Sequence, residues 1–231
     1  MSFKFINFAN MLKIELHNRI IENKDWATLL FIICFMLITI AKSAFENRFN
    51  DFKNLIFSER YIKIYKDYSH LMTWFTFLFF IVQILVFGFF IQYLCFYFGY
   101  IIKSDWLFFI KIITLLSFFI LSKYLIEKII ATSFDIEEFA EQYNMLKVSY
   151  RNYTALLLLP VTVILFYNDK PTVLFLYIIL SVLLFSNLLI YLKAIKLFQK
   201  IIIGKLFYFI LYICTLEIAP YYFMYYWFTR T

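Results

Sequence analysis

The chain has 231 residues, of which 64% are hydrophobic, and its mean hydropathy is +0.80. Soluble domains are about 45–50% apolar, so repeated apolar stretches of membrane-spanning length indicate a surface that meets lipid. The net charge is +7. Because the Lys and Arg residues flank the apolar stretches, we attribute this charge to topology and contact with anionic lipid, and we expect no nucleic acid partner. The composition predicts an all-α polytopic membrane protein.

The N-terminal segment 1–25 predicts an amphipathic helix that lies in the membrane interface, ahead of a transmembrane domain over 26–231. Its charged residues lie off the apolar stripe, and the segment is too long and too acidic for a typical signal peptide. The stripe consists of residues at helical spacing: Phe5, Phe8, Ala9, Leu12 and Leu16.

The transmembrane domain is expected to contain six spans joined by three long and two short loops. The spans are expected at about 26–41, 71–98, 106–126, 153–167, 173–192 and 206–228. Between the first two, segment 42–70 is basic and carries an aromatic stripe, which indicates helices on the membrane surface. The second loop, Lys103-Ser-Asp105, is short and predicts a tight turn in which Ser104 or Asp105 caps the next helix.

The segment 127–152 is expected to be a loop with an acidic cluster on a solvated helix face. Its aromatic and aliphatic residues recur every three or four positions, and docking of a basic partner is the alternative interpretation of the cluster. The three long loops carry most of the Lys and Arg residues, so the positive-inside rule places them in the cytoplasm and both termini on the opposite, periplasmic side.

The cysteines and histidines indicate neither a metal site nor a disulfide. Cys34, Cys95 and Cys214 lie in apolar stretches without a C-x-x-C motif, where cysteine usually acts as a small hydrophobic residue. His17 and His70 lie outside the spans, which leaves a haem held by paired histidines within the membrane unsupported. We therefore expect no cofactor.

Glu217 is the main candidate for a functional residue, because it lies at the midpoint of the expected span 206–228. A charge at the bilayer centre costs roughly 2.5–3.5 kcal/mol, so the carboxyl group needs a partner, water or a proton. By depth, Gln83 is the best candidate for a hydrogen-bond partner and Lys111 for a charged one. Pro220 frees a backbone carbonyl beside the carboxyl group, which either opens a polar pocket or only bends the helix.

Three stretches of the chain resemble a Bacteroidota family of multi-spanning membrane proteins that is known only as a domain of unknown function. The most specific is Leu211-Tyr-Ile-Cys-Thr-Leu-Glu-Ile-Ala-Pro220, which holds a polar residue and a proline at fixed spacing in an apolar helix. The others are Asp25-Trp-Ala-Thr-Leu-Leu-Phe31 and Leu156-Leu-Leu-Leu-Pro160. The resemblance covers most of the chain from about Asp25 and implies an inner-membrane location. It implies no reaction, cofactor or catalytic residue.

The sequence shows no nucleophile–base pair, phosphate-binding loop or internal repeat, and it contains only three glycines. These features favour a rigid scaffold over a carrier with broken, rocking helices. We therefore expect a non-enzymatic inner-membrane subunit or accessory protein of a cell-envelope complex, with the lipid bilayer and other membrane proteins as partners. One alternative is a small transporter or proton-coupled subunit that uses Glu217. Another is a membrane enzyme, or the partner of one, that acts on a polyprenyl lipid.

Overall fold

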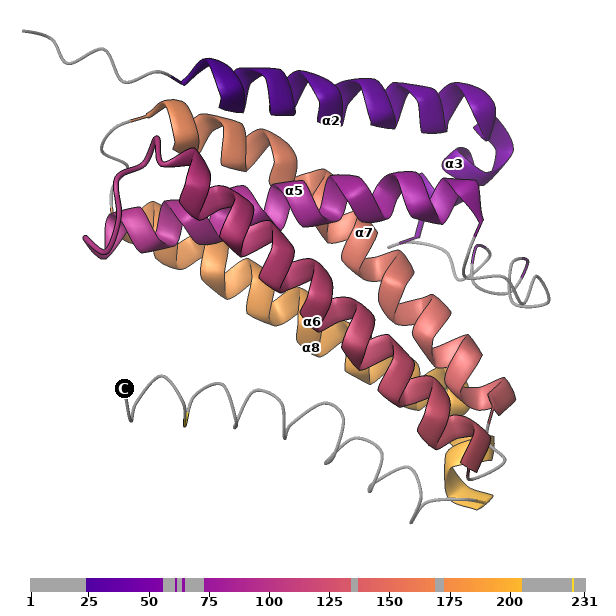
Figure 1. The fold of residues 1–231 in the computed structure, drawn as a ribbon. Helices are drawn as coiled ribbons and strands as arrows, with labels where there is room; N and C mark the ends of the chain where they lie inside the picture. Colours follow the sequence, from indigo (N-terminus) through magenta and orange to yellow (C-terminus); the bar gives the residue numbers. More distant parts are fainter. Residues whose placement is uncertain are drawn as a thin grey trace, which may run out of the picture.

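The structure is a computed structural model of the chain, and it describes residues 24–55, 61, 64, 73–133, 137–168, 173–204 and 226 (Figure 1). The regular elements of this part of the chain are all helices. In chain order they are α2 (Asp25–Ala44), α3 (Glu46–Lys53), α5 (Trp74–Tyr97), α6 (Trp106–Ser133), α7 (Glu137–Tyr167) and α8 (Val173–Gly204). All except α3 are long and apolar enough to cross a membrane.

The five long helices alternate in direction, and ring contacts establish which ends lie together. Trp26, at the start of α2, lies 5.1 Å from Phe109 near the start of α6 and 6.0 Å from Phe166 near the end of α7, measured between ring centroids. We call this the Trp26 end of the bundle. The opposite end, where α2 turns into α3 and α5 begins, is the α3 end (Figure 1).

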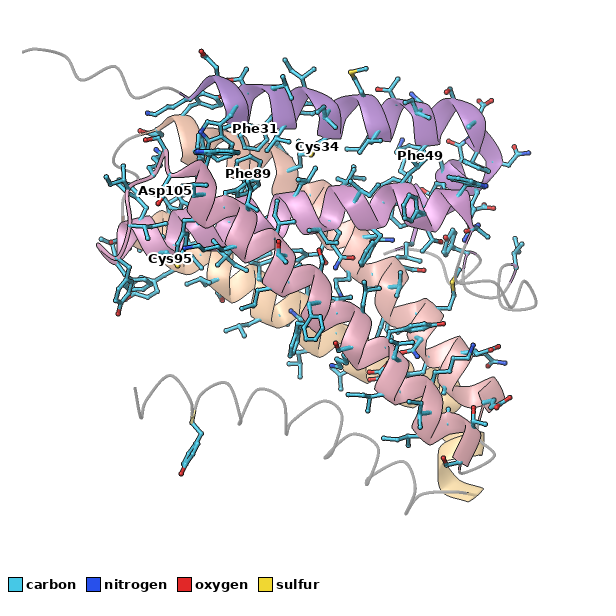
Figure 2. The ribbon with its side chains drawn as sticks, viewed as in Figure 1. Phe31, Cys34, Phe49, Phe89, Cys95 and Asp105 are labelled. Carbon is cyan, nitrogen blue, oxygen red and sulfur yellow. The ribbon has the colours of Figure 1, made fainter. Side chains whose placement is uncertain are left out.

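The helix α5 is the central element, because it packs against α2, α6 and α7. Its buried side chains face several directions and contribute to core clusters at both ends of the bundle. At the Trp26 end, Phe89 stacks on Phe31 of α2 with centroids 4.2 Å apart (Figure 2). In lipid, helix association depends on van der Waals packing rather than on a hydrophobic driving force, so these interlocking rings hold the helices together.

The short helix α3 is amphipathic, and its apolar stripe packs onto the bundle. Phe52 is buried, and its ring centroid lies 4.9 Å from that of Phe79 in α5. Phe45 and Phe49 pack against the same cluster of core residues. The aromatic stripe that the sequence assigns to a surface helix therefore serves as the contact between this helix and α5.

The turn between α5 and α6 is fixed by a glycine and a helix cap. Gly99 has φ 81°, the left-handed conformation that glycine adopts at a helix end without strain. The carboxylate of Asp105 accepts hydrogen bonds from the backbone N–H groups of Leu107 and Phe108, both at 3.1 Å. Of the two residues that the sequence offers as the cap of α6, the structure therefore selects Asp105 (Figure 2).

The segment 127–152, expected as a loop between two spans with a solvated helix face, is largely helical, because α6 continues to Ser133 and α7 already begins at Glu137. The physical reason is packing. Tyr143 and Leu146 are buried in the core cluster of the α3 end, so the apolar face of the segment continues the helix beyond its membrane-spanning part. Likewise, α8 continues to Gly204, past the expected limit at 192.

Two parts of the sequence-based prediction lie outside the described residues. They are the amphipathic segment, of which residues 1–23 are not described, and the expected last span 206–228 apart from Tyr226.

Candidate functional site

A polar pocket of about 270 Å³ lies between α5, α6, α7 and α8. Its lining combines amide and cationic side chains with apolar ones. The polar residues are Gln83 of α5, Lys123 of α6, Lys147 and Arg151 of α7, and Asn187 of α8; the apolar ones are Phe87, Leu116, Phe119, Ile120 and Ile190. Four separate helices thus place polar groups around one cavity.

Helical spacing explains why these residues share the cavity. Lys147 and Arg151 are four residues apart on α7, so they lie on the same face one turn from each other. On α6, Leu116, Ile120 and Lys123 repeat at intervals of four and three residues and also share a face. Each helix therefore presents one continuous stripe to the pocket.

The pocket lies away from the Trp26 end, in the second half of the membrane-spanning length. At ~1.5 Å rise per residue, Lys123 lies roughly 25 Å along α6 from Trp106, and Arg151 lies roughly 24 Å along α7 from Tyr167. By the same measure, Gln83 lies roughly 21 Å from Tyr97. Along the helices, the cationic groups therefore lie slightly further from the Trp26 end than the Gln83 amide does.

A buried ion pair borders the pocket on its α3 side. The Lys147 ammonium lies 2.8 Å from a Glu127 carboxylate oxygen, and both side chains are almost fully buried. The ammonium also lies 4.9 Å from the centroid of the Tyr143 ring. Since a buried charge needs a partner, the pair joins α6 to α7 and neutralises the charge of Lys147.

Gln83 is the most deeply buried polar group of the lining, at 2% exposure. Its side-chain amide makes no hydrogen bond to any described residue. Buried amides are usually hydrogen-bonded, so this one is available to whatever occupies the cavity. Asn187, in contrast, donates to the backbone carbonyl of Leu183 at 2.9 Å.

The Trp26 end contains a second polar centre, in which the Lys103 ammonium and the Gln92 amide nitrogen are bonded to protein. The Lys103 ammonium donates to the backbone carbonyl of Asn168 at 2.9 Å and is surrounded by aromatic rings. The Gln92 amide donates to the backbone carbonyls of Lys103 and Asp105, at 3.1 and 2.9 Å. These bonds fix the α5–α6 turn against the end of α7.

A third polar centre joins α3 to the start of α5. The Arg48 guanidinium donates to the hydroxyls of Thr73 at 2.8 Å and Tyr61 at 3.2 Å, and it lies 4.9 Å from the centroid of the Phe75 ring. Burial raises the pKa of Tyr61, so the neutral phenol is favoured there. This centre holds α3 against the start of α5.

The structure separates the two described residues that the sequence nominates as partners of Glu217. Gln83 lines the pocket, whereas Lys111 lies exposed on α6 and is not part of the lining. Glu217 and Pro220 lie outside the described residues, so their relation to the pocket stays a prediction.

Sequence reasoning missed Lys123, Lys147 and Arg151 as members of one site. The signal available was helical spacing: the four-residue interval between Lys147 and Arg151, and the continuation of the stripe on α6 to Lys123. This signal is weak in the sequence alone, because cationic residues near the end of an apolar stretch are also typical of the flanks of a span.

The chemistry of the pocket is that of binding an anion. Its lining has cations and amides but, among the described residues, no acidic group and no nucleophile beside a base. No group of His, Cys, Asp and Glu residues in the described part of the chain is arranged to hold a metal ion. Cys34 and Cys95 are free thiols.

The helices and their lengths define an all-α polytopic membrane protein. Within that class, residues 27–228 match the family described as Domain of unknown function (DUF4271), and the chain belongs to this family. No curated protein and no solved structure matches the chain.

Proposed function

We propose that this protein is a non-enzymatic subunit or scaffold of a cell-envelope complex in the bacterial inner membrane, in a Bacteroidota cell as the sequence resemblance implies. The observation that carries the proposal is that most helices are tied to one another by polar contacts, whereas α6 leaves most of its surface exposed. Buried polar groups tie α3, α5, α6 and α7 together, while α6 has only three buried residues along its whole length: Phe109, Glu127 and Ala131.

Several exposed side chains on α6 support a role in contacting other membrane proteins. Phe118 is 74% exposed and Leu115 is 63% exposed. Such a surface can contact lipid, another segment of this chain or a helix of a partner protein. If the bundle is rigid, the surface is available for contact without a conformational change. On the positive-inside rule, the α3 end and the long loops face the cytoplasm.

Site-specific photo-crosslinking in cells tests the proposal. A photoreactive residue at Phe118 should give crosslinks to one or a few membrane proteins, and purification in mild detergent should recover the same proteins in fixed ratio. Phe109, buried against Phe89 with ring centroids 4.3 Å apart, is the matched control and should give crosslinks only within the chain. A lone monomer that catalyses proton-dependent uptake in liposomes would contradict the proposal.

A small transporter or proton-coupled subunit is the second candidate, and the polar pocket is the observation that favours it. A cavity that contains Gln83 at some depth in the bundle resembles the interhelical polar sites of transporters. Replacing Glu217 with Gln separates the two candidates. A scaffold should assemble with its partners at normal levels, whereas a proton-coupled protein should lose proton-dependent activity while it still assembles.

A further inference from the structure

The Arg151 guanidinium brings a positive charge to the polar pocket, and no acidic side chain of the described residues pairs with it. Its side chain is half-buried and lines the cavity together with two lysines. Both lysines interact with other groups of the protein: Lys147 pairs with Glu127, and Lys123 has an interaction of its own. Because a charge held between membrane-spanning helices is costly without a counter-charge, the guanidinium of Arg151 favours a bound anion.

The side-chain amide of Gln83 is an independent indication of a ligand. This residue is 2% exposed and lines the same cavity, yet its amide bonds to no described residue. Buried amides in folded proteins are nearly always hydrogen-bonded, because an unsatisfied donor loses the bonds that water would otherwise provide. A ligand oxygen that accepts a hydrogen bond from this amide would restore such a bond.

The rest of the pocket determines what kind of molecule fits beside these two donors. Gln83 belongs to α5 and Arg151 to α7, two helices that pack against each other. Five apolar side chains form much of the remaining wall: Phe87, Leu116, Phe119, Ile120 and Ile190. The cavity, at about 270 Å³, is slightly smaller than the roughly 300–1,000 Å³ of pockets for drug-sized ligands. These features favour a ligand with one anionic end and a single short apolar chain over a two-chain lipid.

We propose that this pocket binds a carboxylate that carries a short apolar chain, with the Arg151 guanidinium and the Gln83 amide as its donors. The planar guanidinium presents two parallel N–H groups that match the two oxygens of a carboxylate, and the amide donates to one of these oxygens. The single charge of Arg151 balances a carboxylate. A phosphomonoester, with about −1.5 to −2 charges at pH 7, would exceed that charge.

Binding to the purified full-length chain in neutral detergent at pH 7 tests the site. Calorimetric titration and thermal unfolding are measured with three probes: octanoate, octan-1-ol and acetate. Octanoate should bind saturably and raise the unfolding temperature. Octan-1-ol has the same chain without the charge, and acetate has the same charge without the chain, so each should bind at least ten-fold more weakly. Equal binding of octanoate and octan-1-ol would overturn the proposal, because it would mean that the carboxylate contributes nothing.

Variants of Arg151 decide whether the carboxylate binds at the proposed guanidinium. Arg151→Gln should weaken octanoate binding roughly ten-fold, the loss expected for one charge-assisted hydrogen bond. Arg151→Lys keeps the charge but loses the paired N–H groups, so it should weaken binding less, which guards against a variant that simply fails to fold. Lys111→Gln is the control, because it removes a positive charge at an exposed position outside the pocket. An equal loss in Lys111→Gln and Arg151→Gln would contradict the site.

Gln83→Leu gives a readout that a purely structural role would not produce. Because the amide makes no described bond to protein, its replacement should leave the unliganded protein as stable as before or more so, while it weakens octanoate binding several-fold. One further variant separates an external carboxylate from one of this chain. If octanoate bound only after Glu217 was replaced with Gln, the pocket would serve that side chain, and the proposal of an external ligand would be wrong. The absence of saturable binding to any of these proteins would likewise refute it.

Discussion

The two ends of the helix bundle treat buried cations in opposite ways. At the Trp26 end, Lys103 is 1% exposed; its ammonium donates to a backbone carbonyl and lies 5.5–5.7 Å from the centroids of three rings. Towards the α3 end, Arg151 faces a cavity and pairs with no acidic side chain of the described chain. At the Trp26 end, the Lys103 ammonium donates to a protein carbonyl; towards the α3 end, the Arg151 guanidinium keeps N–H donors that face the cavity. This difference separates a structural cation from a candidate ligand-binding one.

The largest effect is expected where a buried charge loses its partner. Glu127→Gln should lower the free energy of unfolding by about 4 kcal/mol, because the Lys147 ammonium would keep its buried position and lose the Glu127 carboxylate. Thermal or chemical unfolding in detergent measures the loss. The double variant Glu127→Gln/Lys147→Met should recover most of it, and a double variant that is no more stable than the single one would show that the ion pair is not the cause.

A slightly smaller loss is expected from the aromatic packing at the Trp26 end. The Phe89 ring lies 4.2 Å from that of Phe31 and 4.3 Å from that of Phe109, measured between centroids, so Phe89→Ala should leave a cavity and cost about 3 kcal/mol. The same unfolding assay applies. Phe118→Ala, at a 74% exposed position of α6, is the control and should change stability by less than about 0.5 kcal/mol.

The direct comparison of the two cations predicts a moderate effect at one end and almost none at the other. Lys103→Gln should cost about 2 kcal/mol, because it removes a charge-assisted hydrogen bond to the Asn168 carbonyl and the contacts with the surrounding rings. Arg151→Gln should change the stability of the unliganded protein by less than about 0.5 kcal/mol. Equal losses for both variants would mean that Arg151 is also committed to the fold.

The smallest expected effect concerns the buried amides. Gln92 donates to two backbone carbonyls of the α5–α6 turn, so Gln92→Leu should destabilise the protein by about 1–2 kcal/mol. Gln83→Leu should leave stability unchanged or raise it by up to about 1 kcal/mol, since no described bond is lost. Hydrogen exchange at the α5–α6 turn provides a second measurement: exchange should become faster in the Gln92 variant only.

Much of the architecture was predictable because membrane crossing depends on local composition. A run of about 20 apolar residues is nearly sufficient to identify a spanning helix, and the sequence places one over each of the long helices that the structure describes. The cap at Asp105 was predictable as well, since a carboxylate ahead of an apolar run is a common helix start. The helix ends outside the apolar stretches were not predictable. The start of α7 at Glu137, for example, depends on packing against residues that are distant in the sequence.

The candidate site was only partly predictable. Counting residues along the span identifies Gln83 as a candidate, because its position along a single helix can be read from the sequence. Lys111 lies exposed on α6 and outside the pocket lining, and its pairing with Glu217 stays a prediction, because depth alone says nothing about rotation around the helix axis. Lys123 and Arg151 were missed for the complementary reason: their significance arises from the face that each helix turns towards its neighbours.

The sequence by itself determined the class of protein and the position of each polar residue along its described helix, because these depend on hydrophobicity and on the fixed rise of a helix. The tertiary structure decided which polar residues meet. The turn between α5 and α6 places Lys103 among aromatic side chains, and packing of α5 between its neighbours turns Gln83 towards a cavity with Lys123 and Arg151. Such rotation depends on the shapes of side chains far apart in the sequence, so no local pattern contains it.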